Sequence, residues 1–176
     1  MAITLDGTNG ITAPDIDVTA QSSDISTSGD ISAVDATLSG GVYLGGTGAA
    51  NYLDDYEEGT WTPTVSQGTV SLGSNNIYVK VGKLVTVWCQ LSTFSNRTSS
   101  DQITISGLPF TGETGFCHGG VFGQYCDTDA QSVYMIGSGL SIRLVRNDSG
   151  AFHYVQYNDL NNSAASFYIG MTYKIA

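Results

Sequence analysis

The sequence predicts an all-β protein in which a thin, extended N-terminal stalk leads into a β-sandwich or jelly-roll-like head. All 10 Tyr, both Trp and all 6 Phe lie at or beyond Tyr43, so the side chains that build a core belong to the later part of the chain. Two long segments there, residues 83–91 and 166–175, alternate along the chain with the period of two that is typical of a half-buried strand. No stretch combines a sustained helical period with strong helix formers. These patterns divide the chain into a stalk (residues 1–39), a collar (residues 40–63) and a head (residues 64–176).

The stalk has too few apolar side chains to fold as a separate monomeric unit. Its aliphatic residues are scattered among Ser, Thr, Asp and Gly, and burying them would not offset the conformational entropy lost on ordering the chain. The tripeptide Asp-Ile-Ser recurs at residues 24–26 and 30–32, and such short strand-like pieces favour an intertwined fibre in which neighbouring chains cover each other. A disordered tail, a short coiled-coil turn over residues 31–38 and an independently folded piece are the alternatives.

The collar separates two unlike parts of the chain. Its glycines allow chains to come close together. Its apolar residues are predicted to form the first layer of a homotrimer junction, and they are Tyr43, Leu44, Tyr52, Leu53 and Trp61. Trp61 is expected at the base of the head. The acids Asp54, Asp55, Glu57 and Glu58 are interpreted as the solvated rim of this junction.

The head is predicted to contain short strands separated by turn residues. The expected strands are residues 77–81, 83–91, 102–106, 116–126, 131–136, 140–146, 152–157 and 166–175. Gly82 marks a tight turn, and residues 147–150 (NDSG) mark a hairpin. The glycines within residues 116–126 predict a bulge or a close approach to a neighbour. The order of the strands in a sheet does not follow from these patterns.

Composition excludes several classes of partner. Six basic and sixteen acidic residues give a formal net charge of −10, which opposes binding to phosphate backbones and to anionic membrane surfaces. The N-terminus lacks the basic and apolar regions of a signal peptide, and no apolar run approaches the roughly 20 residues of a membrane-spanning helix. We therefore expect a protein made in the cytoplasm that binds no nucleic acid and does not insert into a membrane.

No metal site with a complete set of ligands is recognisable. Residues 15–17 and 127–129 each have two aspartates separated by one residue, but they lack the remaining ligands of a calcium loop. Cys117, His118 and Cys126 supply only three of the four ligands that structural zinc takes. The three cysteines lack CxxC spacing, which predicts reduced, mostly buried thiols, with a Cys117–Cys126 disulfide as the alternative.

Catalytic motifs are equally incomplete. The collar acids could mimic the carboxylate pair of a glycosidase, but adjacent acids in a glycine-rich segment are more typical of a solvated or capping face. His118 and His153 lack a nucleophile-elbow serine, and the glycines of the collar are followed by no Walker lysine. We therefore expect a protein that is not an enzyme and that carries no cofactor.

The candidate contacts to another molecule are tyrosine and asparagine side chains on expected loops and outer faces. Tyrosine supplies contact area and amides supply adaptable hydrogen bonds, a combination that suits recognition of sugars or proteins, although cross-strand packing also uses tyrosine. The predicted contacts are Tyr125, Tyr134, Tyr154, Tyr157, Asn158 and Asn161.

Three segments of the chain carry a resemblance to a known family. Residues 52–63 (YLDDYEEGTWTP), 78–85 (YVKVGKLV) and 103–109 (ITISGLP) resemble the C-terminal region of tail-fibre-like proteins of tailed bacteriophages, notably marine and cyanobacterial ones. Residues 5–11 (LDGTNGI) look like stretches that occur in the same fibres. The matching segments are structural, so the resemblance transfers architecture and no catalytic residue.

The resemblance implies a homotrimeric virion fibre, made in the host cytoplasm and released by lysis. Its N-terminal segment would attach to another virion protein, and its β-rich head would bind a host cell-surface glycan or protein. Because the chain is short, a short tail fibre is the leading hypothesis. A capsid- or neck-decorating fibre and a fibre-borne polysaccharide depolymerase are the alternatives.

Overall fold

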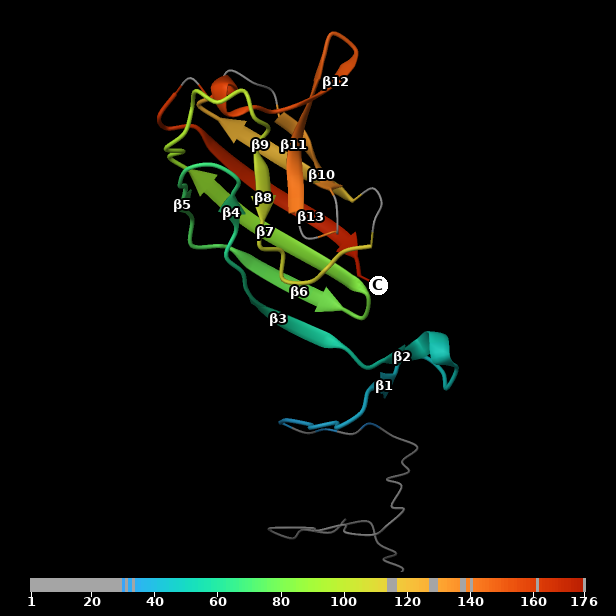
Figure 1. The fold of residues 1–176 in the computed structure, drawn as a ribbon. Helices are drawn as coiled ribbons and strands as arrows, with labels where there is room; N and C mark the ends of the chain where they lie inside the picture. Colours follow the sequence, from blue (N-terminus) through green and yellow to red (C-terminus); the bar gives the residue numbers. More distant parts are fainter. Residues whose placement is uncertain are drawn as a thin grey trace, which may run out of the picture. The chain divides into compact units, whose positions relative to one another are not determined.

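The computed structural model describes residues 30, 32, 34–113, 117–126, 130–136, 139, 141–160 and 162–175. The chain forms two units, Met1–Thr37 and Leu38–Ala176. Nearly all of the predicted stalk lies outside the described residues. The described part of the second unit consists of strands, loops and two short 3₁₀ helices, which confirms the prediction of an all-β protein (Figure 1).

Thirteen strands are present among the described residues. They are β1 (Val42–Tyr43), β2 (Tyr52–Leu53), β3 (Tyr56–Thr60), β4 (Thr64–Val65), β5 (Ser71–Leu72), β6 (Ile77–Val81), β7 (Leu84–Ser92), β8 (Thr104–Ser106), β9 (His118–Gln124), β10 (Ala130–Ile136), β11 (Ser141–Asp148), β12 (Ala151–Tyr154) and β13 (Ser166–Lys174). The 3₁₀ helices are η1 (Ala49–Asn51) and η2 (Tyr157–Asp159), and neither is long or apolar enough to cross a membrane.

Eleven strands form one antiparallel sheet in the order β3-β6-β7-β13-β9-β10-β11-β8-β4, with β12 paired to β11 and β5 paired to β7. The sheet curls, so that β8 and β11 lie across the core from β7 and β13 (Figure 1). Strand β13 pairs with β7 over its whole length and with β9 on its other side, which places the C-terminal strand in the interior of the sheet. Strands β1 and β2 form a separate two-stranded hairpin.

The period of two explains which side chains enter the core. In β7, Val85, Val87, Cys89 and Leu91 are buried, as the alternation predicts, while Leu84 and Trp88 are exposed. The same alternation in β13 buries its odd-numbered residues from 167 to 173. Ile103 and Ile105, around the start of β8, and Ile142 and Leu144, from β11, complete the opposite side of the core.

Two turns form where the sequence predicts them. Gly82 has φ +55° in the turn between β6 and β7. Ser149 and Gly150 have φ of +52° and +83° in the turn between β11 and β12. Positive φ at both central residues matches the twist of the flanking strands, so this is the turn type that two-residue hairpins favour.

The strand pairing corrects two predictions about the chain and decides between the two alternatives of a third. The predicted collar is divided, because β3 pairs with β6 along its whole length and therefore belongs to the main sheet. The predicted strand over residues 152–157 ends at Tyr154, and Tyr157 begins η2. Residues 118–124 pair with β13 without a bulge, but a Cβ at Gly123 would lie 2.8 Å from the Cys126 sulfur, so a close approach is present there.

The three cysteines are in the reduced state, as predicted, with Cys89 and Cys117 buried and Cys126 half-buried. Burial raises the pKa of the Cys89 thiol to about 12, so this group stays protonated near neutral pH and is a poor nucleophile.

Candidate binding site on the outer sheet face

The outer face of the sheet consists of the outward-pointing residues of β3, β6, β7, β13 and β9. Strand register places seven large apolar side chains on this face, and each is 40–65% exposed. They are Tyr56, Ile77, Val81, Leu84, Trp88, Phe122 and Tyr168. Glu58 and Lys174 are the only charged residues at the outward positions whose side chains the structure describes. Apolar and aromatic surface with so little charge is typical of the central part of a contact surface.

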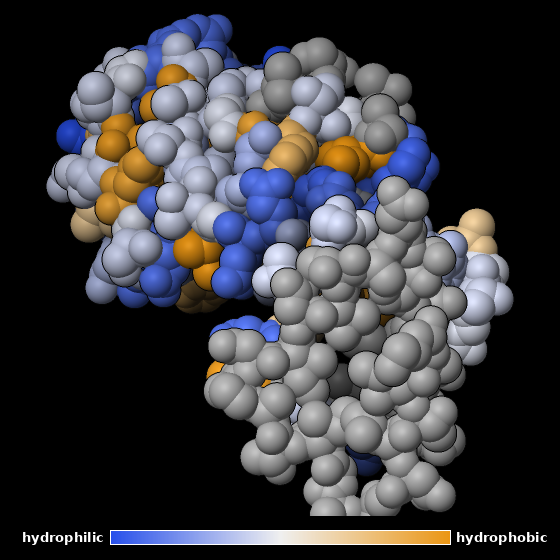
Figure 2. All heavy atoms as spheres, turned by 90° about the horizontal axis from the view of Figure 1, so that it is seen from below, coloured by the Kyte–Doolittle hydropathy of each residue, from blue (hydrophilic) through white to orange (hydrophobic). Residues whose placement is uncertain are grey.

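Hydrophobic and hydrophilic residues are interspersed on the surface of the head. Seen from below, the head shows orange hydrophobic patches set among paler residues and blue hydrophilic ones (Figure 2). On the outer face, a polar pair divides the exposed apolar residues: the hydroxyl oxygens of Thr86 and Thr172 lie 2.9 Å apart in a hydrogen bond between β7 and β13. Val81 and Leu84 lie on one side of this pair, and Trp88 and Tyr168 lie on the other.

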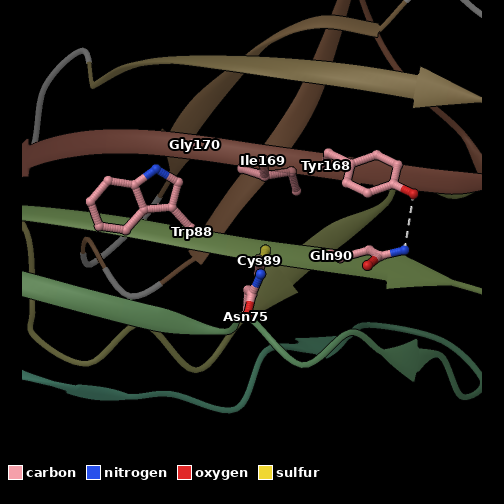
Figure 3. A pocket seen from close by; sticks show the side chains of 7 residues that line it. All are labelled: Asn75, Trp88, Cys89, Gln90, Tyr168, Ile169 and Gly170. Carbon is pink, nitrogen blue, oxygen red and sulfur yellow. Dashed lines mark hydrogen bonds between the residues drawn. The ribbon is translucent and has the colours of Figure 1, made fainter.

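A shallow pocket of about 290 Å³ lies around Trp88 and Tyr168. Its lining comes from the loop before β6 and from neighbouring positions of β7 and β13 (Figure 3). The lining residues are Asn75, Trp88, Cys89, Gln90, Tyr168, Ile169 and Gly170. None of them carries a formal charge at neutral pH. We call this site the outer-face pocket.

Cross-strand pairing sets the shape of the outer-face pocket. Trp88 on β7 pairs with Gly170 on β13, and Gln90 on β7 pairs with Tyr168 on β13. Each aromatic ring therefore lies opposite a residue without a ring, a glycine in one pair and an amide in the other. A Cβ at Gly170 would lie 3.5–3.6 Å from two atoms of the Trp88 indole, so the indole rests close to the glycine backbone (Figure 3). Gly120 on β9 pairs with Gly170 on the next strand and has open space where its side chain would be.

Hydrogen bonds orient the polar groups of the pocket. Gln90 Nε2 donates to the Tyr168 hydroxyl at 3.1 Å, which leaves the hydroxyl proton of Tyr168 to be donated elsewhere (Figure 3). The loop that carries Asn75 is held by its neighbour Asn76, which accepts from the Gln90 backbone N–H at 3.2 Å and donates to the Gly73 carbonyl at 2.7 Å. Within the described part of the chain, the side-chain amide of Asn75 has no hydrogen-bond partner.

The two tryptophans differ in a way that singles out Trp88. Trp61 is 6% exposed, and its indole N–H donates to the Trp88 carbonyl at 3.0 Å. Trp88 is 41% exposed, and its own indole N–H has no partner among the residues that the structure describes. Tryptophan N–H groups usually find a partner when the ring is buried, so Trp88 presents both an apolar ring and a donor to the surroundings.

The predicted contact residues are distributed over several places, and one of them is wrong. Tyr157 is fully buried, and its hydroxyl accepts from the Gln67 backbone N–H at 3.0 Å and lies 3.1 Å from the Ser66 hydroxyl. A tyrosine in that position stabilises the core and cannot contact a partner. The prediction failed because residues 152–157 were expected to form one alternating strand, whereas the chain turns into η2 at Tyr157.

Three other predicted contacts are exposed or half-buried. Tyr125, directly after β9, is 60% exposed with φ +56°. Tyr154 on β12 is half-buried, with the Arg143 guanidinium 5.0 Å from its ring centre. Asn158 is exposed in η2, and its backbone N–H donates to the Ser99 carbonyl. The side chain of Tyr134 and the whole of Asn161 lie outside the described residues, so these two stay predictions.

The predicted trimer-junction residues fall into two groups. Tyr43 and Tyr52 face each other across the β1–β2 hairpin with ring centres 4.8 Å apart, and they are 50% and 39% exposed. Leu44 is 60% exposed and Leu53 is half-buried. Trp61, by contrast, belongs to the core of a single chain, so it cannot be a contact between chains.

The collar acids are held by neighbouring side chains. Asp55 forms an ion pair with the buried Lys80, and Glu57 accepts a hydrogen bond from the Tyr78 hydroxyl. Glu58 accepts from the Tyr56 hydroxyl at 3.0 Å, and this hydrogen bond raises the pKa of Tyr56. Asp54 is exposed. In the described part of the chain, no three His, Cys, Asp or Glu side chains lie close enough together to hold a metal ion. Residues 15–17 and 127–129 lie outside that part.

Sequence reasoning missed the outer-face pocket although a signal was present. Trp88 stands between Thr86 and Gln90 on the polar side of an alternating strand, where a large aromatic residue is unexpected. The pairing of β7 with β13, which brings Tyr168 and Gly170 beside it, joins residues about eighty positions apart and leaves no local pattern.

Comparisons with protein-family models, with curated proteins and with solved structures find no match to this chain.

Proposed function

We propose that the protein is a structural virion protein, the homotrimeric head and stalk of a short bacteriophage tail fibre, which attaches the particle to a host surface without catalysis. The observation that carries this proposal is the outer face, where seven large apolar side chains are 40–65% exposed beside two charged residues. Exposed apolar side chains gathered on one sheet face with little charge are typical of a self-associating or adhesive domain.

Self-association is supported by the hairpin that precedes the sheet. An isolated two-stranded hairpin is marginally stable in water, and β1–β2 is such a hairpin with Val42, Tyr43, Leu44 and Tyr52 exposed. Neighbouring chains would supply the missing apolar cover. The end of the outer face that carries Tyr56, Val81 and Leu84 offers further apolar surface for the same contact.

The resemblance to phage tail fibres supports the trimeric state and the place of the protein on a particle. The segments that carry it map to structural positions: residues 52–63 include β2 and β3, residues 78–85 include the β6–β7 turn, and residues 103–109 include β8. They build the hairpin, the edge of the sheet and the core of a sandwich-like head. The N-terminal unit would attach to another virion protein, and the head would bind a host cell-surface glycan or protein.

Light scattering on the purified full chain tests the oligomer. We expect a mass of three chains, and a well-folded monomer would contradict the proposal. Replacing Tyr43 and Leu44 together by Ser should weaken the trimer, because both side chains are exposed in the hairpin. Tyr125→Ser is the matched control, since Tyr125 is similarly exposed but lies outside the hairpin.

Labelling of intact particles tests the location. An antibody raised against the head should decorate the tail of the particle, and decoration of the capsid or neck would favour the decorating-fibre alternative. Incubation of the trimer with host polysaccharide should leave the polymer length unchanged. Shortened polymer would contradict the non-enzymatic assignment.

A further inference from the structure

We infer that the outer-face pocket binds one uncharged pyranose ring of a surface glycan, stacked on Trp88 and Tyr168. This inference rests on the proposed attachment function and names the chemical class of ligand for it. Trp88 and Tyr168 are 41% and 40% exposed, stand on neighbouring strands and flank the bare backbone at Gly170 (Figure 3). A sugar ring has one face of C–H groups, which packs against aromatic rings because they supply rigid apolar area.

The size of the pocket selects a small ligand. Its volume of about 290 Å³ is at the lower end of the range for pockets that enclose small molecules, about 300–1,000 Å³. One ring fits such a site, and the rest of a glycan chain would extend over the sheet. Gly120, which pairs with Gly170 and has open space above it, leaves the next strand unobstructed.

The polar groups around the pocket match hydroxyl groups. The Tyr168 hydroxyl and the Trp88 indole offer donors, and the Gln90 side-chain carbonyl and the Asn75 amide offer acceptors on the same rim. A sugar hydroxyl is both a donor and an acceptor, so it can satisfy either kind. An apolar peptide side chain in this place would remove these groups from water without giving them partners, which costs free energy for each group.

The charge of the site excludes acidic ligands. All seven lining residues are uncharged, and the chain as a whole carries a formal charge of −10. A uronic acid, a sialic acid or a phosphate would therefore meet repulsion without a basic residue in the lining to compensate for it. An uncharged hexose or N-acetylhexosamine meets no such penalty.

A second copy of the chain is the other occupant to consider. The hydrogen-bonded Thr86–Thr172 pair separates the pocket from Val81 and Leu84, so apolar contact between chains at that end need not reach Trp88. The free donors and acceptors of the pocket also favour a hydroxylated ligand over the apolar surface of another head.

The two tryptophans provide the measurement. In the ¹⁵N-labelled full chain each indole N–H gives its own NMR signal, one for Trp88 at the pocket and one for Trp61 in the core. Titration with the methyl glycosides of glucose, galactose, mannose, N-acetylglucosamine and N-acetylgalactosamine should shift the Trp88 signal for at least one sugar and leave Trp61 in place. Methyl glucuronide, which is charged, should bind at least about tenfold more weakly than methyl glucoside.

Substitutions separate the parts of the site. Trp88→Ala should weaken binding at least about tenfold, because the stacking ring is lost. This variant lacks the Trp88 signal, so calorimetric titration of each protein with the same glycoside measures the affinities. Tyr168→Phe keeps the ring and should weaken binding about threefold to tenfold through loss of one hydrogen bond. Phe152→Ala, at an aromatic residue on β12 that is 59% exposed, should change affinity by less than about twofold. A retained β-rich circular dichroism spectrum and a cooperative urea melt in each variant show that the fold is intact.

Three outcomes overturn the inference. In a trimeric protein, an unmoved Trp88 signal with every neutral glycoside rejects the sugar site and leaves the fibre proposal standing. A Trp88 signal that changes only with protein concentration shows that another copy covers the pocket. Binding that survives Trp88→Ala places the ligand elsewhere. A monomeric protein whose Trp88 signal responds to sugar would instead contradict the fibre proposal and retain the pocket.

Discussion

Trp61 and Trp88 show how much of a residue's role depends on its neighbours in space. Trp88 occupies an outward position of β7, which the alternation along that strand predicts. Trp61 follows β3 in a segment without alternation, and its ring enters the core while its indole N–H reaches the Trp88 carbonyl. Local pattern therefore predicted the environment of one tryptophan and not of the other.

The hydroxyl of Tyr157 should have a measurable effect on stability. Tyr157→Phe removes the buried hydroxyl that accepts from the Gln67 N–H and contacts the Ser66 hydroxyl. The Ser66 hydroxyl keeps its contacts to Gln102 and Thr104. The Gln67 N–H, however, loses its partner, which should lower the free energy of unfolding by about 0.5–1.5 kcal/mol. Urea denaturation at a fixed protein concentration measures the change.

The matched control for that prediction is Tyr125→Phe. Tyr125 is 60% exposed, so loss of its hydroxyl should change the free energy of unfolding by less than about 0.5 kcal/mol. Equal effects of the two substitutions would show that the Tyr157 hydroxyl is not held as the structure describes.

Strand β3 shows how an element outside the predicted head became part of the sheet. It pairs with β6 in full register, and the residue just before it, Asp55, forms an ion pair with Lys80 of β6. The Lys80 ammonium also lies 5.3 Å from the centre of the Phe110 ring. Lys80 is 5% exposed, so these partners replace water around its ammonium, and Asp55 helps to hold β3 at the edge of the sheet.

Asp55→Asn should therefore destabilise the head. Removing the carboxylate leaves the buried ammonium of Lys80 without its charged partner, and we expect a loss of roughly 1.5–3 kcal/mol in the free energy of unfolding. Asp54→Asn, one position away and exposed, should change it by less than about 0.5 kcal/mol.

A second substitution tests the cause. Adding Lys80→Met to Asp55→Asn should recover part of the lost stability, because the double variant no longer buries an unpaired charge. Thermal or urea melts of the wild type, Asp55→Asn, Lys80→Met and the double variant give the coupling free energy between the two side chains. No recovery in the double variant would mean that Asp55 acts through its own backbone geometry and not through Lys80.

At the scale of the whole molecule, net charge and apolar contact oppose each other. Each chain carries a formal charge of −10, while the proposed contact between chains uses apolar side chains of the hairpin and of one end of the outer face. Raising the ionic strength from about 0.01 M to about 1 M shortens the screening length from about 30 Å to about 3 Å. Repulsion between copies then decreases, so association should become tighter. The oligomer should then persist to lower protein concentrations before it dissociates.

Sedimentation equilibrium over that range of salt measures this effect. The double variant in which Ser replaces Tyr43 and Leu44 should also associate more tightly as salt is raised. Its association should be weaker than that of the wild type at every salt concentration. Salt-induced dissociation would be the contrary result, since it would indicate that ion pairs hold the chains together.

The features that could be predicted from the sequence are those that depend on near neighbours along the chain. Alternation identified β6, β7 and β13 almost to the residue, and glycine-containing turns located Gly82 and Gly150, because strand period and positive φ are local properties. The all-β class and the thiol state followed from the same kind of pattern and from composition.

The features that could not be predicted depend on which distant strands pair. Alternation leaves strand order open, so nothing local showed that β13 would lie between β7 and β9, that β3 would join β6, or that Tyr157 would turn inward. The outer-face pocket belongs to this class, because Trp88 and Gln90 on one strand become a site only beside Tyr168 and Gly170 on another. Local chemistry specified the strands, and long-range pairing between them assembled the surface to which we assign binding.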